Sequence, residues 1–100
     1  MDEAGLIKAL KALADPKRIR MAREIASAGE LSCGEVKAHF HLSQPTISHH
    51  LKILADAGVI MVREAGQHRF ISVNLDLVHE IAAMLPFSVH SKAARKRKRS

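Results

Sequence analysis

Hydrophobic residues recur every three or four positions over the first thirty residues, the spacing of one face of an α-helix. A first helix over about residues 3–14 is predicted by four apolar side chains: Leu6, Ile7, Leu10 and Leu13. Asp15 followed by Pro16 predicts a new helix start, because aspartate caps a helix N-terminus and proline fits its first position. The second helix then ends near Gly29, and we expect three of its residues to face inward: Ile19, Ala22 and Ile25.

Two short helices follow, each preceded by a serine that predicts its N-cap. Ser32 and Glu35 stand three residues apart, the spacing of a capping box. Ser43 precedes the next helix, and Gly58 predicts its end. The apolar positions of that helix fall at i, i+4 and i+7: Ile47, Leu51 and Leu54. Two such helices joined by three or four residues predict a helix-turn-helix.

The period of the apolar positions then changes from helical to extended. Residues 59–62 and 69–73 predict two short strands, and residues 64–67 predict a glycine-containing hairpin turn between them. A hairpin directly after a helix-turn-helix is a wing. A last helix before Pro86 is predicted by Leu75, Val78, Ile81 and Leu85. The predicted fold is therefore mainly α with a small β-hairpin, a dimeric winged helix-turn-helix of order α-α-α-α-β-β-α over residues 1–90.

The positive charge of the chain is concentrated at its end. The 100 residues suffice for one domain, and the net charge of +6 comes from 16 basic and 10 acidic residues. Six basic residues lie in the last nine positions, so residues 1–90 carry no net charge. We expect residues 91–100 to form a disordered basic tail. Such a tail either remains solvated or contacts phosphates and adds affinity that is independent of base sequence.

Composition also excludes several classes of protein. One cysteine excludes an intrachain disulfide and favours a reducing compartment, the cytoplasm. No apolar run approaches the roughly 18 residues that cross a bilayer, so we expect no membrane partner. The absence of Trp and Tyr argues against base stacking on single-stranded nucleic acid. Because no phosphate-binding loop or zinc-hydrolase spacing occurs, we expect no enzymatic activity and no cofactor.

Several segments of the chain resemble the ArsR/SmtB family of winged-helix repressors. The resemblance spans about residues 6–85 and depends on Ala12-Leu13-Ala14-Asp15-Pro16 with Arg18-Ile19-Arg20, on Glu30-Leu31 with Glu35-Val36, on Leu42-Ser43-Gln44-Pro45-Thr46-Ile47-Ser48-His49-His50-Leu51-Lys52-Ile53-Leu54, and on Ala57-Gly58-Val59-Ile60. It implies a homodimeric bacterial or archaeal repressor that binds double-stranded DNA, and many members release DNA when a metal or another effector binds. We expect a dimer through the first and last helices, whose apolar residues exceed what one small domain buries: Leu6, Leu10, Ile81 and Leu85.

The second helix of the helix-turn-helix carries the candidate DNA-reading face. On a helical wheel with Ile47 inward, the outward face is polar and contains neither glutamate nor lysine before Leu51. Gln, Ser, Thr and His side chains can bond base edges in the major groove. The candidate DNA-binding residues of this helix are Gln44, Pro45, Thr46, Ser48, His49 and Lys52. His50 lies nearer the core, and we expect it to be packed and hydrogen-bonded.

The predicted wing supplies a second set of candidate DNA-binding residues. These residues are Arg63, Gln67, His68 and Arg69. A wing beside a recognition helix can reach the adjacent minor groove or its phosphates. Charges at a hairpin tip are as often only solvated, so both interpretations remain open here.

Neither metal site of the resembling family is complete in this sequence. The first uses two cysteines at alternate positions of the third helix, where this chain has Ser32 and Gly34. The second uses an Asp and a His on the last helix, where this chain has Leu75 and Leu77. We therefore expect no metal-dependent release from DNA. The weaker candidates for an unorthodox metal site across a dimer are Asp76, His79, Glu80 and His90.

Cys33 is a candidate for redox sensing. One thiolate per chain cannot build a soft-metal site, and oxidation of a lone thiol needs an intermolecular partner or sulfenic acid chemistry. The effector, the operator and the regulated genes stay open.

Three functions compete. We favour a sequence-specific repressor that binds an inverted-repeat operator as a homodimer without the usual metal sites. A second hypothesis is a zinc-type metal-responsive repressor that uses the unorthodox His/Glu site of the last helix. The third is a winged helix that binds only protein, against which the carboxylate-free helix face and the basic tail argue.

Overall fold

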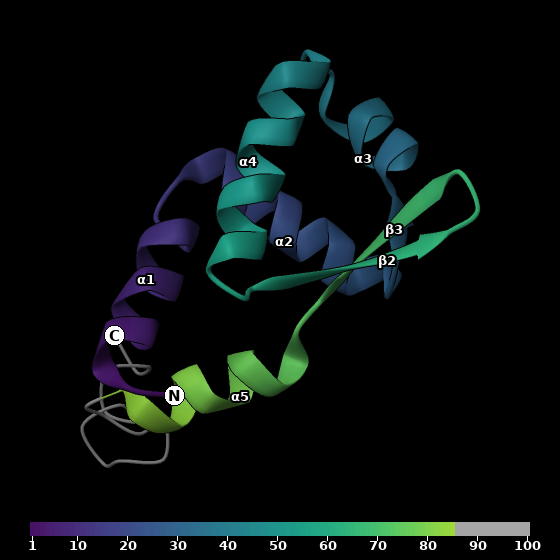
Figure 1. Cartoon of the computed structure of the whole chain (residues 1–100). Coiled ribbons are helices and arrows are strands. Elements are labelled where there is room, and N and C mark those ends of the chain that lie inside the picture. Colours follow the sequence, from purple (N-terminus) through teal and green to yellow (C-terminus); the bar gives the residue numbers. More distant parts are fainter. Residues whose placement is uncertain (86–100) are drawn as a thin grey trace, which may run out of the picture.

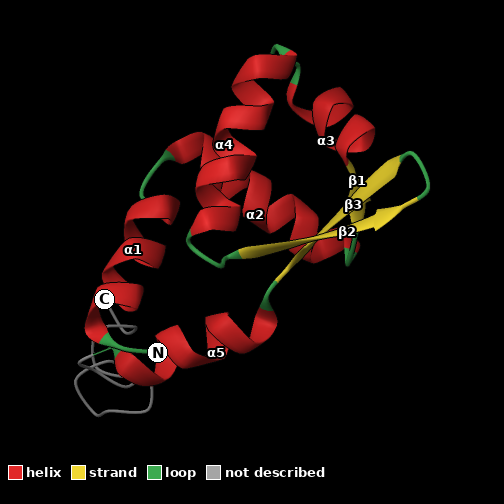
Figure 2. Ribbon diagram, viewed as in Figure 1, coloured by secondary structure: helices red, strands yellow, loops and turns green. Residues whose placement is uncertain are grey.

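The computed structural model describes residues 1–85, which form five helices and three strands (Figures 1 and 2). In chain order the elements are α1 (Glu3–Leu13), α2 (Pro16–Ala28), β1 (Leu31–Ser32), α3 (Cys33–Phe40), α4 (Gln44–Asp56), β2 (Ile60–Ala65), β3 (His68–Val73) and α5 (Leu75–Met84). The predicted fold class and element order are confirmed, apart from the additional strand β1. Residues 86–100, which include the predicted tail, lie outside the described residues.

The helices begin where the capping residues predicted. The Asp15 carboxylate accepts hydrogen bonds from two backbone N–H groups in the first turn of α2, at 3.0 Å each. Ser32 and Glu35 form the predicted reciprocal capping box at the start of α3. Ser43 caps α4 by accepting from the backbone N–H of Thr46. These local bonds satisfy donors that would otherwise have no partner in the helix.

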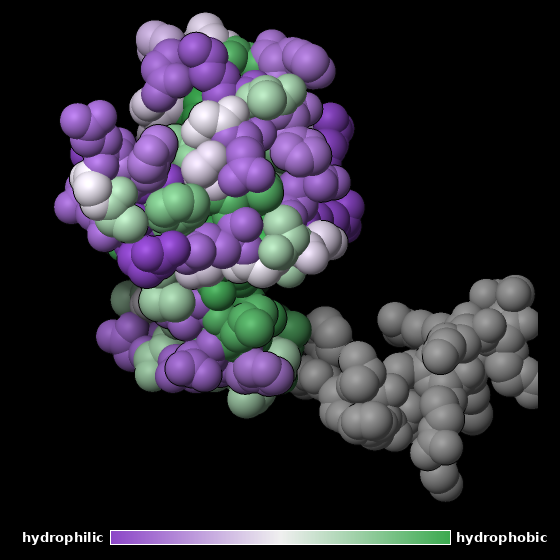
Figure 3. Space-filling view, turned by 90° about the vertical axis from the view of Figure 1, so that its right-hand side faces the viewer, coloured by the Kyte–Doolittle hydropathy of each residue, from purple (hydrophilic) through white to green (hydrophobic). Residues whose placement is uncertain are grey.

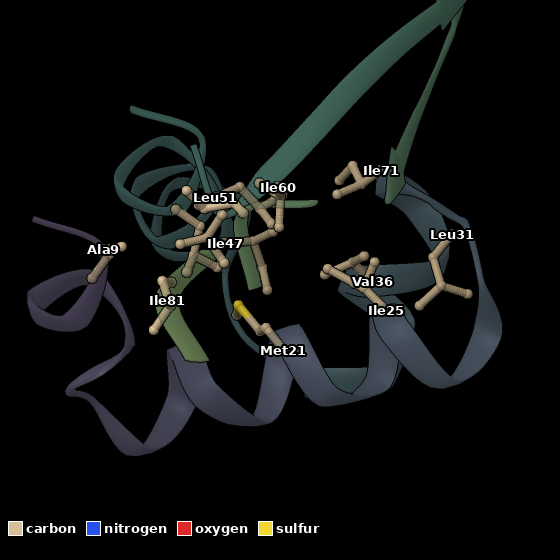
Figure 4. Packing of buried hydrophobic residues seen from close by; sticks show 14 residues of the cluster. Ala9, Met21, Ile25, Leu31, Val36, Ile47, Leu51, Ile60, Ile71 and Ile81 are labelled. Atoms are coloured by element: carbon tan, nitrogen blue, oxygen red, sulfur yellow. The ribbon is translucent and has the colours of Figure 1, made fainter. Parts of the chain in front are cut away.

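Helix α2 crosses the middle of the domain and contacts α1, α3, α4 and β3. Its Met21 and Ile25 are fully buried and meet Ile47 of α4 and Ile71 of β3 in one hydrophobic cluster (Figure 4). Each such side chain contributes roughly 1.5–3 kcal/mol by leaving water. The core therefore fixes the position of α4 from two sides, by α2 below it and by the sheet beside it.

The sheet contains a short strand that the hydrophobic pattern did not predict. Its order is β1-β3-β2, with all neighbours antiparallel. Strand β1 has two residues, and Leu31 pairs with Ile71 while Ser32 pairs with Phe70. Two residues are too few to show a period of two. Because β1 leads directly into α3, its pairing ties the first helix of the helix-turn-helix to the middle of strand β3.

The wing is longer than predicted, and its turn is tighter. Strands β2 and β3 pair in register from Ile60 with Val73 out to Ala65 with His68. Only Gly66 and Gln67 remain for the turn, instead of the predicted residues 64–67. Gly66 has a φ of 61°, while Gln67 is not among the positive-φ residues. This is the pattern of a type II′ turn, which matches the twist of paired strands and favours glycine at its first position.

The inward face of α2 differs from the predicted one. Ile19 was expected in the core, yet 37% of its surface is exposed, whereas Met21 is completely buried. The actual inward positions follow the spacing i, i+3, i+4 and i+7: Arg18, Met21, Ala22 and Ile25. The charged residue occupies a core-facing position because its guanidinium finds two acceptors there, Ala12 and His50.

Helices α1 and α5 leave apolar side chains uncovered. Helix α1 buries Ala9 and Ala12 but exposes Ile7 by 51% and Leu10 by 40%. Helix α5 buries Leu77 and Ile81 but exposes these two: Leu75 and Val78. Figure 3 shows hydrophobic residues gathered low on the molecule, at the height where Figure 1 places α5 and the start of α1. Within residues 1–85, none of the helices has the length and apolar character that crossing a membrane requires.

The corrected face of α2 predicts unequal effects of two truncations. Met21→Ala should lower the free energy of unfolding by about 2–5 kcal/mol, because it leaves a cavity in the core. Ile19→Ala should lower it by less than about 1 kcal/mol, because that side chain is partly solvated already. Urea unfolding at one fixed protein concentration measures both. Equal losses would contradict the observed face.

Candidate nucleic-acid interface

The turn between α3 and α4 presents α4 as the second helix of the helix-turn-helix. His41 ends α3 in a left-handed conformation, with a φ of 51°, and its backbone N–H bonds the carbonyl of Lys37. Phe40 and Leu42 on either side of it pack against the core. This reversal lets Ser43 start α4 only three residues after α3 ends.

Helix α4 has a buried stripe along one side. Its buried residues are Ile47, His50, Leu51 and Leu54. They meet the core formed by α2 and the sheet. Because a helix turns by 100° per residue, burying this stripe determines which α4 residues face outward.

The opposite side of α4 is exposed, polar and free of carboxylates through its first three turns. Its exposed residues include five of the six predicted DNA-binding residues: Gln44, Pro45, Ser48, His49 and Lys52. The sixth, Thr46, is half-buried, and its hydroxyl lies 2.8 Å from the Ser43 hydroxyl. Lys52 pairs with Asp56 one turn further on, at 3.1 Å. The free N-terminal half of this face therefore offers uncharged donors and acceptors.

The wing brings its candidates into two different environments. Arg63, which pairs with Phe70 in the middle of the wing, makes two hydrogen bonds to the Glu30 carboxylate, at 3.2 and 2.9 Å. Its guanidinium lies 4.7 Å from the centre of the Phe70 ring. The bonds from Arg63 lower the pKa of Glu30. Gln67 and His68 are exposed at the tip. Arg69 is also exposed and forms a cross-strand ion pair with Glu64, at 3.4 Å. Arg63 is thus engaged in contacts within the protein, whereas the candidate residues at the wing tip are exposed to solvent.

A cleft of about 340 Å³ lies between α4 and the wing. Its apolar lining comes from both elements: Ile47, Leu51, Ala55, Val62 and Ile71. Gln44, Ser48, Lys52 and Arg69 complete the lining with Cys33. Cys33, the candidate redox residue, is a half-buried free thiol at the first position of α3. Four of the predicted DNA-binding residues, three from α4 and Arg69 from the wing, therefore border one cleft.

His50 is packed and hydrogen-bonded, as expected. It is 8% exposed, and its Nδ1 lies 3.4 Å from a guanidinium nitrogen of Arg18. A guanidinium only donates, so Nδ1 accepts and the neutral imidazole carries its proton on Nε2. Burial lowers the pKa of His50. The sequence analysis did not identify Arg18 as the hydrogen-bond partner of His50. A charged residue at a core-facing position of a helix could have indicated such a buried hydrogen bond.

The metal candidates are not brought together within residues 1–85. His79 and Glu80 are both exposed on α5, and Glu80 lies 3.5 Å from the amino group of Met1. No group of three or more His, Cys, Asp or Glu side chains suited to a metal ion occurs in this part of the chain. The fourth candidate, His90, lies outside the described residues.

Comparisons with known proteins agree with this geometry. The family described as "Helix-turn-helix domain" matches residues 13–63. The transcriptional repressor SdpR of Bacillus subtilis is 37% identical over 70 residues, which cover 70% of this chain and 77% of SdpR. The arsenical resistance operon repressor of Staphylococcus xylosus is 38% identical over 80 residues, with 70% of this chain and 76% of that protein covered.

A solved structure has the same fold. It is a homodimeric winged helix-turn-helix DNA-binding domain from Mycobacterium bovis, described as a possible ArsR-family transcriptional regulator. It superimposes with a TM-score of 0.70 over 80% of this chain and 74% of that one, at 21% identity. The family match, the curated repressors and the shared fold lead to one conclusion: the chain belongs to the ArsR family of winged helix-turn-helix transcriptional regulators.

Proposed function

We propose that this regulator is a repressor that binds an inverted-repeat operator as a homodimer and reads bases with the exposed face of α4. The observation that carries the proposal is the composition of that face. Ordinary exposed helices are rich in Glu and Lys, yet α4 exposes Gln44, Ser48 and His49 with no carboxylate before Asp56. Such side chains match the donors and acceptors of base edges in the major groove.

The N-terminal half of α4 would enter the groove first. Residues at the start of a recognition helix generally reach deepest. Pro45 fits the first turn of α4, because the N–H that proline lacks would have no acceptor within the helix there. Lys52, one turn from the end of α4, stands where a phosphate contact is expected. Gln67, His68 and Arg69 at the wing tip would contact the neighbouring minor groove or its phosphates, while Arg63 holds the wing to Glu30.

Dimerisation would use the uncovered apolar faces of α1 and α5. Within one chain Ile81 is buried, and Leu6 and Leu85 are half-buried. We therefore assign the surface to the more exposed side chains: Ile7, Leu10 and Val78. Exposed apolar groups of this size favour association with a second copy. Two recognition helices in such a dimer would meet successive major grooves about 34 Å apart.

The proposed repressor acts without the metal sites usual in its family. Ser32 and Gly34 cannot supply thiolates, and Leu75 and Leu77 cannot ligate a metal. No observation favours the metal-responsive or the protein-binding alternative over DNA reading. A DNA target and a free thiol both favour the cytoplasm as its location, and we assign the protein no catalytic activity.

The recognition-helix assignment predicts a loss that depends on base sequence. Ser48→Ala and His49→Ala should each weaken binding to a duplex selected from a random pool by about 1–3 kcal/mol, because base contacts are removed. Binding to a scrambled duplex should change little. Fluorescence anisotropy measures both, with His39→Ala, an exposed histidine of α3, as the control. Equal losses on the two duplexes would show phosphate contacts instead.

If α1 and α5 form the dimer interface, introducing one charged residue there should dissociate the dimer. Ile7→Glu should produce a monomer at micromolar concentration, because the carboxylate would be buried in an apolar interface. Met61→Glu, at an equally exposed apolar residue of the wing, should remain dimeric. Sedimentation velocity distinguishes the two states. A wild-type monomer at this concentration would reject the proposal.

The charge distribution predicts a role for residues 92–100, which lie outside the described residues. Replacing their six basic residues by glutamine should weaken binding to all duplexes alike, because the rest of the chain carries no net charge. The slope of log affinity against log salt should flatten by about 0.9 per lost phosphate contact. A salt titration measures this slope, and an unchanged slope would mean that the tail does not touch DNA.

A further inference from the structure

Arg18 connects three helices through one side chain. Its Nε donates to the backbone carbonyl of Ala12, at the end of α1, over 2.6 Å. Its Nη1 donates to Nδ1 of His50, on the buried side of α4, over 3.4 Å. Its own backbone N–H donates to the Asp15 carboxylate that caps α2. The junction between α1 and α2 is thus bonded directly to the recognition helix.

The point of attachment on α4 is close to the DNA-reading residues. His50 follows His49, which projects from the exposed side of the same helical turn. The backbone of a helix is stiff, so a rotation or shift that moves His50 also moves His49 and Ser48. Apolar contacts of Ile47 and Leu54 are not directional, whereas a hydrogen bond to a planar guanidinium is.

We propose that Arg18 and His50 form a positioning pair that orients the recognition helix, and that protonation of His50 releases this helix and weakens sequence-specific DNA binding. The inference rests on the proposed function of α4. Neither residue contacts DNA in this arrangement; both act through the residues next to His50. The ArsR-type segment around Asp15 and Pro16 thereby gains a role, because it brings Arg18 to the inner side of α4.

The chemistry of the pair requires a neutral imidazole. An imidazolium has no acceptor for the guanidinium N–H, because both its ring nitrogens carry protons. Protonation would also place two positive groups 3.4 Å apart at a site where His50 is 8% exposed. Both effects push the pair apart and favour orientations of α4 other than the one described.

The ionisable groups around His50 favour its neutral form. Burial is the largest cause of its lowered pKa, and Arg18, His49 and Lys17 lower it further, while Asp15 opposes them. These groups come from α2, its cap and α4. Helix α1 adds two lysines, Lys8 and Lys11, to a pocket that Arg18 and Asp56 also line. Among the described residues, α3 and β2 contribute no group to this shift.

The sign of the pH effect follows from the lowered pKa. The unfolded chain, with an ordinary histidine pKa of 6.5, takes up the proton before the native pair does. The contribution of neutral His50 is therefore complete above that value and is lost as the pH falls through the lower native pKa. If DNA binds only the neutral pair, affinity falls by up to about tenfold per pH unit below the native pKa.

The direct test uses the full chain and a duplex selected from a random pool at neutral pH, with a scrambled duplex beside it. Affinities are measured by anisotropy at constant ionic strength, at about pH 7.5 and about pH 5.5. Between these values, wild type should lose more specific affinity than His50→Gln, whose amide accepts a bond but does not titrate, by up to about tenfold per pH unit below the native pKa. His39→Gln should keep the wild-type profile. An identical profile in His50→Gln would overturn the proposal.

A double-mutant cycle tests the contact itself. Arg18→Gln should weaken specific binding by about tenfold, and His50→Leu, which has no acceptor, should weaken it as well. The double variant should bind no worse than Arg18→Gln alone, because both changes remove one interaction. The exposed Arg20→Gln on the same helix should leave specific binding within about twofold. Additive losses in the cycle would contradict a direct pair. Urea unfolding at both pH values verifies that each variant is folded.

Titration of the wild-type histidines by NMR gives a test that needs no variant. The phosphates of DNA raise the pKa of a nearby exposed imidazole. DNA that selects neutral His50 must lower the pKa of His50 instead. A pKa of His50 that rises or stays constant on adding the selected duplex would reject the inference. Failure to select any duplex would reject the proposed function, whereas a selected duplex with unchanged titration rejects only the positioning pair.

Discussion

Burial of one stripe of α4 is the constraint on which the rest of the structure depends. Ile47 and Leu54 are fully enclosed by α2 and the sheet, and each contributes roughly 1.5–3 kcal/mol. A helix has a single rotation about its axis, so this stripe leaves Ser48 and His49 outward. The residues that hold the fold together and the residues that would read DNA are thus interleaved along thirteen positions of one helix. Packing in the core and presentation of the polar face cannot change independently.

The buried stripe of α4 contains one polar side chain, His50, and Arg18 supplies the hydrogen bond that offsets the free-energy cost of burying it. His50 lies among apolar residues, and an unbonded imidazole there would destabilise the fold. Arg18 supplies the bond and at the same time satisfies the carbonyl of Ala12. A purely apolar stripe would bury α4 equally well but would tolerate small rotations. Hydrophobic burial alone would leave the rotation of α4 loosely defined, whereas the directional bond between Arg18 and His50 restricts it. This bond lies next to the face that we propose reads DNA.

The molecule separates its surfaces by chemistry. The side formed by α4 and the wing is polar around an apolar cleft, whereas α1 and α5 expose apolar residues such as Ile7 and Val78. The wing is held near its middle by Arg63, which bonds Glu30 and lies over Phe70, so that Gln67 and His68 at the tip stay exposed. A second copy on one side and a duplex on the other would therefore not compete for the same residues.

The sequence by itself determined the features that arise from neighbouring residues. Asp15, Ser32 and Ser43 cap helices through bonds within three positions, so the starts of α2, α3 and α4 and the outward face of α4 were predictable. Tertiary structure alone decided which residues met across long separations. Strand β1 exists because Leu31 pairs with Ile71, and Arg63 is tied to a carboxylate 33 positions away. Ile19 is exposed and Arg18 faces inward, because acceptors from two other helices converge on the Arg18 guanidinium. The residues around Arg18 on α2 do not reveal those acceptors, so only the tertiary structure could show this arrangement.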